Sequence, residues 1–276
     1  MDLILGTAQL TRPYGILQAG AAASGSPQEV LYTARDCGFV GVDTAPIYGE
    51  AEKVIGEAQT GLEIHTKIDP ALDGVASIVQ SRERLGVERL GVVYLHEVFD
   101  GSRHQLDTLE RIRDEASGFV ESLGVSIYTR RELEMAVDAE VVRAIQLPLN
   151  VATSDFTESD FREAQSAGKR VYARSIFLQG VLTAAPAHLP PAVVGLQGFV
   201  REFHLLAEKW EMSPVQAAIA FVKSQEGLSG IVVGADSTNS VIEVAKAFRL
   251  SSDSRFIDEC REMRRPDSRA TDPRNW

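Results

Sequence analysis

The sequence predicts a single-domain (β/α)8 TIM barrel, an α/β fold in which eight parallel strands alternate with helices. The chain has 276 residues, a length at which such barrels commonly form one domain. Eight short apolar runs recur along it, and segments with helical spacing lie between most of them. The first run is followed by GTAQLTRPYG, which lacks the Gly-rich turn that the rival fold, a doubly wound sheet, needs at its nucleotide site.

Each apolar run is expected to form one strand. The runs are apolar on both faces, which suits parallel strands covered by helices. The stretch between the last two runs is much longer than the others and holds a Pro-rich loop and two helical segments. The predicted strands cover residues 3–5, 39–42, 63–66, 90–95, 119–125, 141–147, 170–173 and 230–233.

Ser-Pro pairs and isolated Ser or Asn residues mark several helix starts, because their side chains cap free backbone amides and proline suits the first turn. These signals predict helices over residues 28–37, 215–224 and 241–248, and the pattern of residues 253–263 predicts one more helix outside the repeat. The barrel with this helix therefore spans residues 1–263. Residues 264–276 form a polar tail with two prolines, which we expect to be mobile.

Charge and composition exclude several classes of function. Lys and Arg total 28 against 39 Asp and Glu, a net charge of −11 that disfavours nucleic acid and anionic membrane surfaces as partners. No stretch is apolar enough to span a bilayer, and the start of the chain predicts no secretory signal. Cys37 and Cys260 provide neither a disulfide framework nor a metal site. The expected compartment is a reducing cytoplasm, and no oligomeric state is predicted.

Polar residues stand where consecutive apolar runs end. Asp43 ends the second run and Tyr48 follows it closely, while Lys67 and His96 end the third and fourth. In a barrel these strand ends meet at one face, where active sites are built. Because buried polar groups are costly unless they share a polar site, we expect the four side chains to converge.

This set of groups suits proton transfer to a carbonyl. A phenol has a pKa near 10, and a neighbouring ammonium ion favours its phenolate form. Asp43 would hold Lys67 charged, and His96 would donate to the carbonyl oxygen. The set needs no metal ion, but it lacks a hydride source, which only a cofactor supplies.

The segment Asp43-Thr44-Ala45-x-x-Tyr48-Gly49-x-x-Glu52 resembles the signature of the aldo-keto reductases, and Thr66-Lys67 and Leu95-His96 resemble their third and fourth strand ends. The resemblance runs from Leu5-Gly6-Thr7 to Gly234. It implies an oxidoreductase that uses NADPH or NADH to reduce an aldehyde or ketone, or catalyses the reverse reaction. Tyr48 would be the general acid/base, with Lys67 tuning it, Asp43 holding Lys67 and His96 orienting the carbonyl.

The resemblance also implies cofactor contacts. Ser126 and Gln146 match the residues that hold the nicotinamide carboxamide, although Ile127 stands where the family has Asn. Arg174 replaces the aromatic residue that stacks on nicotinamide. Because Asp236 would repel a 2′-phosphate, the sequence favours NADH as a tolerated or preferred cofactor. The cofactor-binding set is Thr7, Ser126, Gln146, Arg174, Ser175, Phe177, Leu178, Gly180, Gly234, Asp236 and Glu243.

The substrate pocket is predicted to be open, because the loop at residues 97–101 and the C-terminal extension are short for the family. A sugar-like aldehyde or ketone, a lactol oxidised in reverse and a small aldehyde are all compatible with it. Arg12 and Tyr14 are candidate pocket residues. His65 and Tyr94, two positions before Lys67 and His96, are expected to fill the barrel interior.

Two other functions are compatible with the sequence. In a class I aldolase-type barrel, Lys67 would form a Schiff base with the substrate. In a non-catalytic regulatory barrel, the pocket would bind NAD(P) without turnover.

Overall fold

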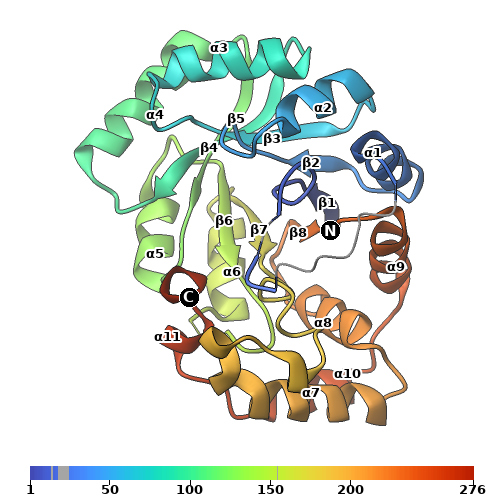
Figure 1. The fold of residues 1–276 in the computed structure, drawn as a ribbon. Coiled ribbons are helices and arrows are strands. Elements are labelled where there is room, and N and C mark those ends of the chain that lie inside the picture. Colours follow the sequence, from blue (N-terminus) through green and yellow to red (C-terminus); the bar gives the residue numbers. More distant parts are fainter. Residues whose placement is uncertain (14, 18–24, 154) are drawn as a thin grey trace.

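The computed structural model describes residues 1–13, 15–17, 25–153 and 155–276, so the pocket candidate Tyr14 lies outside the described residues. Its eight strands form a closed parallel barrel in the order β1 to β8, which confirms the predicted (β/α)8 fold (Figure 1). The strands are β1 (Asp2–Gly6), β2 (Gly41–Asp43), β3 (Glu63–Lys67), β4 (Leu90–Val98), β5 (Val120–Ser126), β6 (Ala144–Pro148), β7 (Arg170–Arg174) and β8 (Gly230–Gly234).

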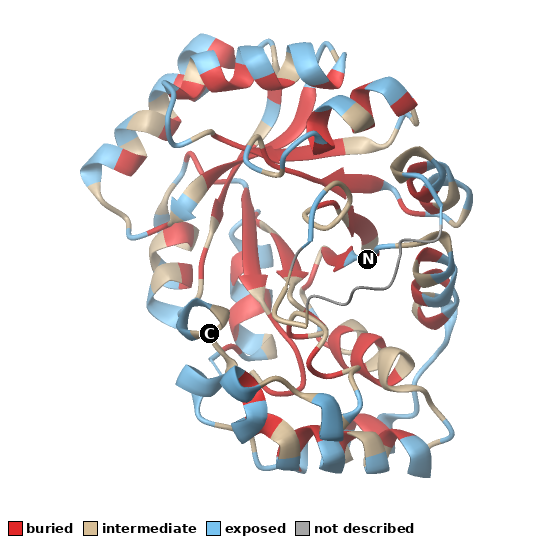
Figure 2. Ribbon diagram, in the orientation of Figure 1, coloured by how far each residue is buried: buried red, intermediate tan, exposed pale blue. Residues whose placement is uncertain are grey.

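Helices surround the barrel, with buried inner faces and exposed outer faces (Figure 2). Ser26 and Ser213 cap α1 and α8 with reciprocal side-chain and backbone hydrogen bonds, as their Ser-Pro starts predict. The helices are α1 (Pro27–Asp36), α2 (Ala51–Ala58), α3 (Gly74–Leu85), α4 (Arg103–Ala116), α5 (Arg130–Asp138), α6 (Glu158–Ser166), α7 (Gln197–Lys209), α8 (Pro214–Lys223), α9 (Thr238–Arg249), α10 (Ser254–Glu262) and α11 (Ser268–Thr271). None of the helices described is long and apolar enough to cross a membrane.

The barrel interior is filled by a layer of large side chains. His65, Tyr94 and Tyr172 are fully buried there, together with smaller apolar residues such as Val92 and Ala144. The His65 ring lies 5.1 Å from the Tyr172 ring, and its Nδ1 is 3.5 Å from the Tyr94 hydroxyl. Because burial disfavours the phenolate, the pKa of Tyr172 rises to about 12. His65 and Tyr94 therefore fill the core, as expected, and close the barrel below the strand ends.

All eight strands differ from their predicted bounds by at least one residue, and two of them differ by three residues at one end. The sixth begins at Ala144 rather than at Val141, because the Val142 amide donates to the Ala139 carbonyl in a turn that ends α5. The apolar residues of this turn made it resemble the start of a strand in the sequence. The fourth continues past the predicted end to Val98, with a register shift against β5 after Tyr94. The long stretch between β7 and β8 holds α7 and α8, as predicted, preceded by two short 3-10 helices.

The tail that follows α10 runs to the strand-end face of the barrel. Arg265 donates to the Val151 carbonyl at 3.3 Å, and the Arg274 guanidinium lies 3.8 Å from the Tyr128 ring. The chain ends beside α5, where the Trp276 indole donates to the Ala270 carbonyl at 3.0 Å (Figure 1). The mobility expected for residues 264–276 stays a prediction.

Candidate active site

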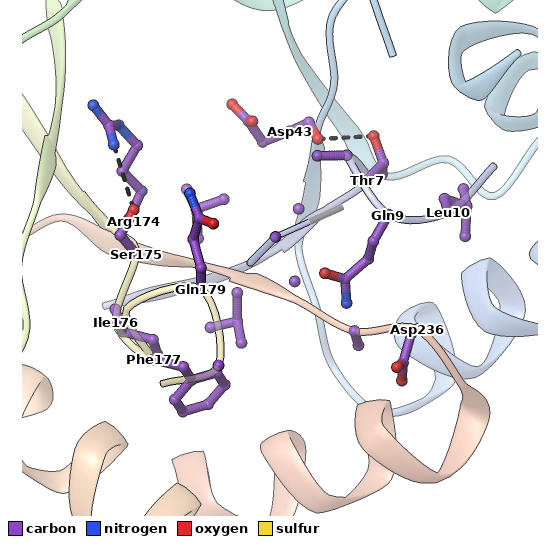
Figure 3. A pocket seen from close by; sticks show the side chains of 18 of the residues that line it. Thr7, Gln9, Leu10, Asp43, Arg174, Ser175, Ile176, Phe177, Gln179 and Asp236 are labelled. Carbon is purple, nitrogen blue, oxygen red and sulfur yellow. Dashed lines mark hydrogen bonds between the residues drawn. The ribbon is translucent and has the colours of Figure 1, made fainter. Parts of the chain in front are cut away.

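A cavity of about 980 Å³ opens at the carboxyl ends of the strands (Figure 3). Its wall brings together nearly all the predicted site residues. Leu178 is the exception, since its side chain is 2% exposed and does not line the cavity. The lining includes Thr7, Asp43, Tyr48, Lys67, His96, Ser126, Gln146, Arg174, Ser175, Phe177, Gly180, Gly234, Asp236 and Glu243.

Asp43 and Lys67 form a buried ion pair at the ends of the neighbouring strands β2 and β3. The Lys67 Nζ lies 2.7 Å from Asp43 Oδ1 and also donates to the Thr44 carbonyl at 2.9 Å. The second carboxylate oxygen, Oδ2, accepts from the Gln146 amide at 2.5 Å. Thr7 donates to the Asp43 backbone carbonyl at 2.9 Å (Figure 3). Asp43 is thus fixed by groups from β3 and β6 and by the residue that follows β1.

The ion pair keeps Lys67 protonated. Burial alone would lower the pKa of Lys67, but the Asp43 carboxylate and the Tyr48 phenol oxygen offset burial and raise that pKa above its usual value. The side chain is therefore an ammonium ion at neutral pH. It places a positive charge 5.0 Å from the centre of the Tyr48 ring.

Tyr48 lies in the turn between β2 and α2, and neighbouring segments hold this turn from two sides. The Tyr48 amide donates to the Ala45 carbonyl at 2.9 Å, and its own carbonyl accepts from the Thr11 hydroxyl at 2.9 Å. Glu52, in the first turn of α2, accepts from the Thr66 hydroxyl on β3 at 2.7 Å. The conformation of the Tyr48 turn therefore depends on contacts with the first loop and with β3.

His96 reaches the same cavity from β4. Burial and the nearby Lys67 ammonium both lower the pKa of His96, so the imidazole is neutral at neutral pH. Its Nδ1 is buried without a hydrogen-bond partner among the described residues. A neutral imidazole has one N–H donor, which is what a carbonyl oxygen needs.

Arg174, at the end of β7, contacts two other residues of the wall. One of its guanidinium nitrogens lies 3.3 Å from the Ser126 hydroxyl, and its Cζ lies 4.5 Å from the centre of the Tyr128 ring. Ser126 is the residue that the family resemblance assigns to the nicotinamide carboxamide. Arg174 and Ser126 therefore line the same region of the cavity.

The loop after β7 has an unusual backbone. Ser175, Leu178 and Gln179 have φ values of 56°, 51° and 53°, and Gly180 has 90°. Left-handed conformations at non-glycine residues cost free energy and cluster at functional sites. Tertiary bonds hold the loop in place: Asn150 donates to the Ser175 carbonyl at 3.1 Å, and the Gln179 side chain accepts from the Ile16 amide at 3.0 Å.

The far end of the cavity is acidic. Asp236 and Glu243 line it, and Asp236 accepts from the Ser240 hydroxyl at 2.8 Å. No lysine or arginine of the described chain lines this end, where the wall runs from Gly234 to Val244. In Figure 3, Asp236 and Arg174 stand at opposite ends of the cavity. The cavity is thus basic near the strand-end phenol and acidic near the start of α9.

Among the wall residues that sequence reasoning missed, two have polar side chains that shape the cavity. Gln9 points toward Asp236 (Figure 3). When its side-chain amide is turned so that the oxygen faces the backbone amides of Ala235 and Asp236, that oxygen accepts a hydrogen bond from each at 3.1 Å. Tyr128 lines the cavity two positions after Ser126. Both stand in loops that follow a strand end, which was the one available signal. No cluster of three or more metal-ligating side chains occurs among the residues described.

Comparisons with known proteins agree with the fold. The sequence model of the Aldo/keto reductase family matches residues 2–265. The glycerol dehydrogenase of Gluconobacter oxydans is 21% identical, with a TM-score of 0.72, over 94% of this chain and 90% of the other. An aldo-keto reductase of Bacillus halodurans in its holo form is 15% identical, with a TM-score of 0.74, over 95% and 91%.

A third solved structure, the aldose reductase of Schistosoma japonicum, is 17% identical, with a TM-score of 0.65, over 94% of this chain and 87% of the other. No curated protein sequence matches the chain significantly. At these identities the solved structures show a shared fold.

Proposed function

The chain belongs to the aldo/keto reductase family of NAD(P)-dependent oxidoreductases, and on this premise we propose that Tyr48, Lys67, Asp43 and His96 are its catalytic residues. The proposed reaction is the reduction of an aldehyde or ketone to an alcohol, or its reverse. The observation that carries the proposal is the meeting of a phenol, an ammonium ion and a neutral imidazole at one cavity.

Each residue has a role that follows from its contacts. Tyr48 donates a proton to the carbonyl oxygen during reduction and takes it back from the alcohol during oxidation. Lys67, held by Asp43, favours the phenolate that remains after proton donation. His96 donates an N–H to the carbonyl oxygen and orients it. Together these groups stabilise negative charge on one oxygen atom.

The remaining wall suits a dinucleotide. Gly180 and Gly234 let the chain pack closely, since a Cβ at Gly180 would meet Leu17 at 2.8 Å and one at Gly234 would meet Gln9 at 3.0 Å. We propose that Thr7, Ser126, Gln146, Arg174, Ser175, Phe177, Gly180, Gly234, Asp236 and Glu243 hold NADPH or NADH. The cofactor, when bound, supplies or accepts the hydride.

The acidic far end supports NADH as a tolerated or preferred cofactor. A 2′-phosphate near Asp236 would be repelled, whereas a ribose hydroxyl can donate to this carboxylate. Asp236→Ala should therefore improve kcat/KM with NADPH more than with NADH in steady-state assays. The control is Asp258→Ala, which removes an exposed carboxylate on α10. An NADPH preference in the unaltered enzyme that survives Asp236→Ala would contradict the argument.

The aldolase alternative is disfavoured by the state of Lys67. A Schiff-base lysine must be neutral to attack a carbonyl and so needs a lowered pKa. Here the pKa of Lys67 is raised, and its Nζ is bound to Asp43 and Thr44. We expect no covalent adduct at Lys67 when borohydride is added with a carbonyl substrate.

Tyr48→Phe tests the proposed function. We expect turnover of a panel of aldehydes and sugars, with NADH or NADPH, to fall by about a hundredfold to ten-thousandfold. Dinucleotide affinity, measured by fluorescence titration, should hardly change. Tyr32→Phe, on the outer side of α1, is the matched control. Binding of a dinucleotide without turnover by the unaltered chain would favour the regulatory barrel, and near-normal turnover by Tyr48→Phe would exclude the phenol as proton donor.

The proposed partners are a small carbonyl or sugar substrate and the cofactor, with neither nucleic acid nor membrane. The proposed compartment is the cytoplasm, since Cys37 and Cys260 are both free thiols.

A further inference from the structure

Two arginines of the cavity wall lack a close carboxylate partner among the described residues. Lys67 is neutralised by Asp43, but Arg12 and Arg174 also line the cavity. Among the described residues neither guanidinium forms an ion pair with a carboxylate, and the residues outside the description include no Asp or Glu. This is unexpected in a chain of net charge −11, where 39 acidic side chains are available as partners.

Arg12 is fixed beside the phenol. The hydroxyl of the preceding residue, Thr11, donates to the Tyr48 carbonyl at 2.9 Å and would lie 3.3 Å from a Cβ on Gly49. This contact fastens the first loop to the Tyr48 turn. The Arg12 Cζ lies 5.5 Å from the centre of the Tyr48 ring, and the side chain is exposed. The Thr11 contact therefore places the backbone of Arg12 beside the phenol, and no described carboxylate binds the Arg12 donors.

Arg174 is less available than Arg12. It already lies near the hydroxyls of Ser126 and Ser175, at 3.3 Å and 3.4 Å, and against the Tyr128 ring. Arg12 forms no hydrogen bond or ion pair with the residues described, and its Cζ lies over the Tyr48 ring, so its planar fork of N–H donors is available to a ligand. Such a fork matches the paired oxygens of a carboxylate or phosphate.

We infer that Arg12 is a specificity-determining residue that binds an anionic oxygen group on the substrate, so that the preferred substrates are aldehydes or ketones bearing a carboxylate or phosphate. This inference rests on the proposed reductase function and names the substrate class for the same site. The carbonyl oxygen sits at Tyr48 and His96, and the anionic group extends toward Arg12 at the mouth of the cavity. The proton and hydride steps are unchanged by it.

The test compares pairs of substrates that differ in charge. The first pair is 4-carboxybenzaldehyde and methyl 4-formylbenzoate, and the second is glyceraldehyde 3-phosphate and glyceraldehyde. We expect kcat/KM to be higher for the anionic member of at least one pair, and the pair that responds distinguishes a carboxylate site from a phosphate site. Arg12→Gln should reduce this preference by about tenfold or more, mainly through KM, and Arg12→Lys should retain part of it.

Arg131→Gln is the matched control, because it removes the same charge from an exposed site outside the cavity. The thermal unfolding midpoint of each variant checks that the exposed substitutions leave the fold intact. The preference should also weaken as the salt concentration rises, since exposed charges are screened.

Three results would overturn the inference. Equal kcat/KM for both members of both pairs would remove the anion site while leaving the reductase function standing. An equal loss for charged and uncharged substrates in Arg12→Gln would mean that Arg12 acts on Tyr48 instead. No turnover of any aldehyde with either dinucleotide would overturn the proposed function, and the inference with it.

Discussion

At the scale of single residues, the site depends most on Asp43. Its carboxylate binds Lys67 through one oxygen and Gln146 through the other, and all three side chains are buried. A buried charge that loses its partner is strongly destabilising, because neither water nor another ion replaces the contact. The Asp43–Lys67 pair therefore supports the fold, and in the proposed mechanism it also supports the chemistry.

Asp43→Asn should lower the free energy of unfolding by about 3–5 kcal/mol, because it leaves the Lys67 ammonium buried without a countercharge. Urea unfolding followed by circular dichroism measures this. The control is Asp107→Asn, which breaks an exposed pair with Arg103 and should cost less than about 1 kcal/mol. An equal loss of unfolding free energy in the two variants would show that the buried pair stabilises the fold no more than the exposed pair does.

The lowered pKa of His96 gives a second prediction. Because burial and the Lys67 ammonium both disfavour the imidazolium, His96 should titrate in nuclear magnetic resonance spectra below its usual value of 6.5. Lys67→Met removes one of these causes, so the pKa of His96 should rise. Lys53→Met, an exposed lysine on α2, should leave that titration unchanged.

The same shift links His96 to stability. The unfolded chain binds the proton at higher pH than the folded one, so this contribution to stability is present above about pH 6.5 and is lost as the pH falls below it. A folded-state pKa of His96 above 6.5 would contradict the assignment of causes.

Site residues were predictable from the sequence where a polar residue stands at the end of an apolar run. Asp43, Lys67 and His96 end apolar runs, and the barrel topology brings such ends to one face. Gln9 and Tyr128 were not predictable, because their roles depend on loop paths that no periodicity encodes. Leu178 was included by its position along the chain, but the left-handed backbone of its loop turns the side chain into the core.

At the scale of elements, α2 carries the turn of Tyr48 and packs closely on α3. A Cβ on Gly56 would collide with the Arg84 carbonyl oxygen, and would lie 2.9 Å from the Leu85 carbonyl carbon. The glycine is therefore required by the approach of the two helices rather than by its backbone angles. Pattern analysis found strands through their apolar runs, but it had no signal for such a close approach.

Gly56→Ala should destabilise the protein by about 1–3 kcal/mol, because α2 must move away from α3. It should also lower kcat, since the moved helix carries the turn that positions Tyr48. Gly198→Ala in α7 is the control: no atom lies within 4 Å of its added Cβ, so it should be neutral or stabilising. Chemical unfolding and steady-state kinetics measure both effects, and wild-type behaviour of Gly56→Ala would mean that the helices separate freely.

At the scale of the whole molecule, the barrel and the tail differ in how their backbones are protected. The strands are bonded on both sides and buried, whereas residues 268–276 form one short turn of helix and one 3-10 turn, neither of which has a buried residue. The order of strands was predictable because each apolar run has a single place in a closed barrel. The path of the tail was not, because its mostly polar composition carries no apolar periodicity.

We expect amide hydrogens in residues 268–276 to exchange much faster than those of β4, because local opening there breaks few contacts. Hydrogen exchange followed by mass spectrometry measures this. Exchange of the tail as slow as that of the barrel strands would contradict the predicted mobility.

The contact of Arg274 with Tyr128 has a practical consequence. Tyr128 lines the cavity, so whatever is attached after Trp276 is tethered close to the pocket mouth. Asp2, by contrast, begins β1 at the opposite end of the barrel. A purification tag or fusion partner is therefore best placed before Met1. A tag attached after Trp276 would lie near the pocket mouth, and the measured kinetic constants would include its effect.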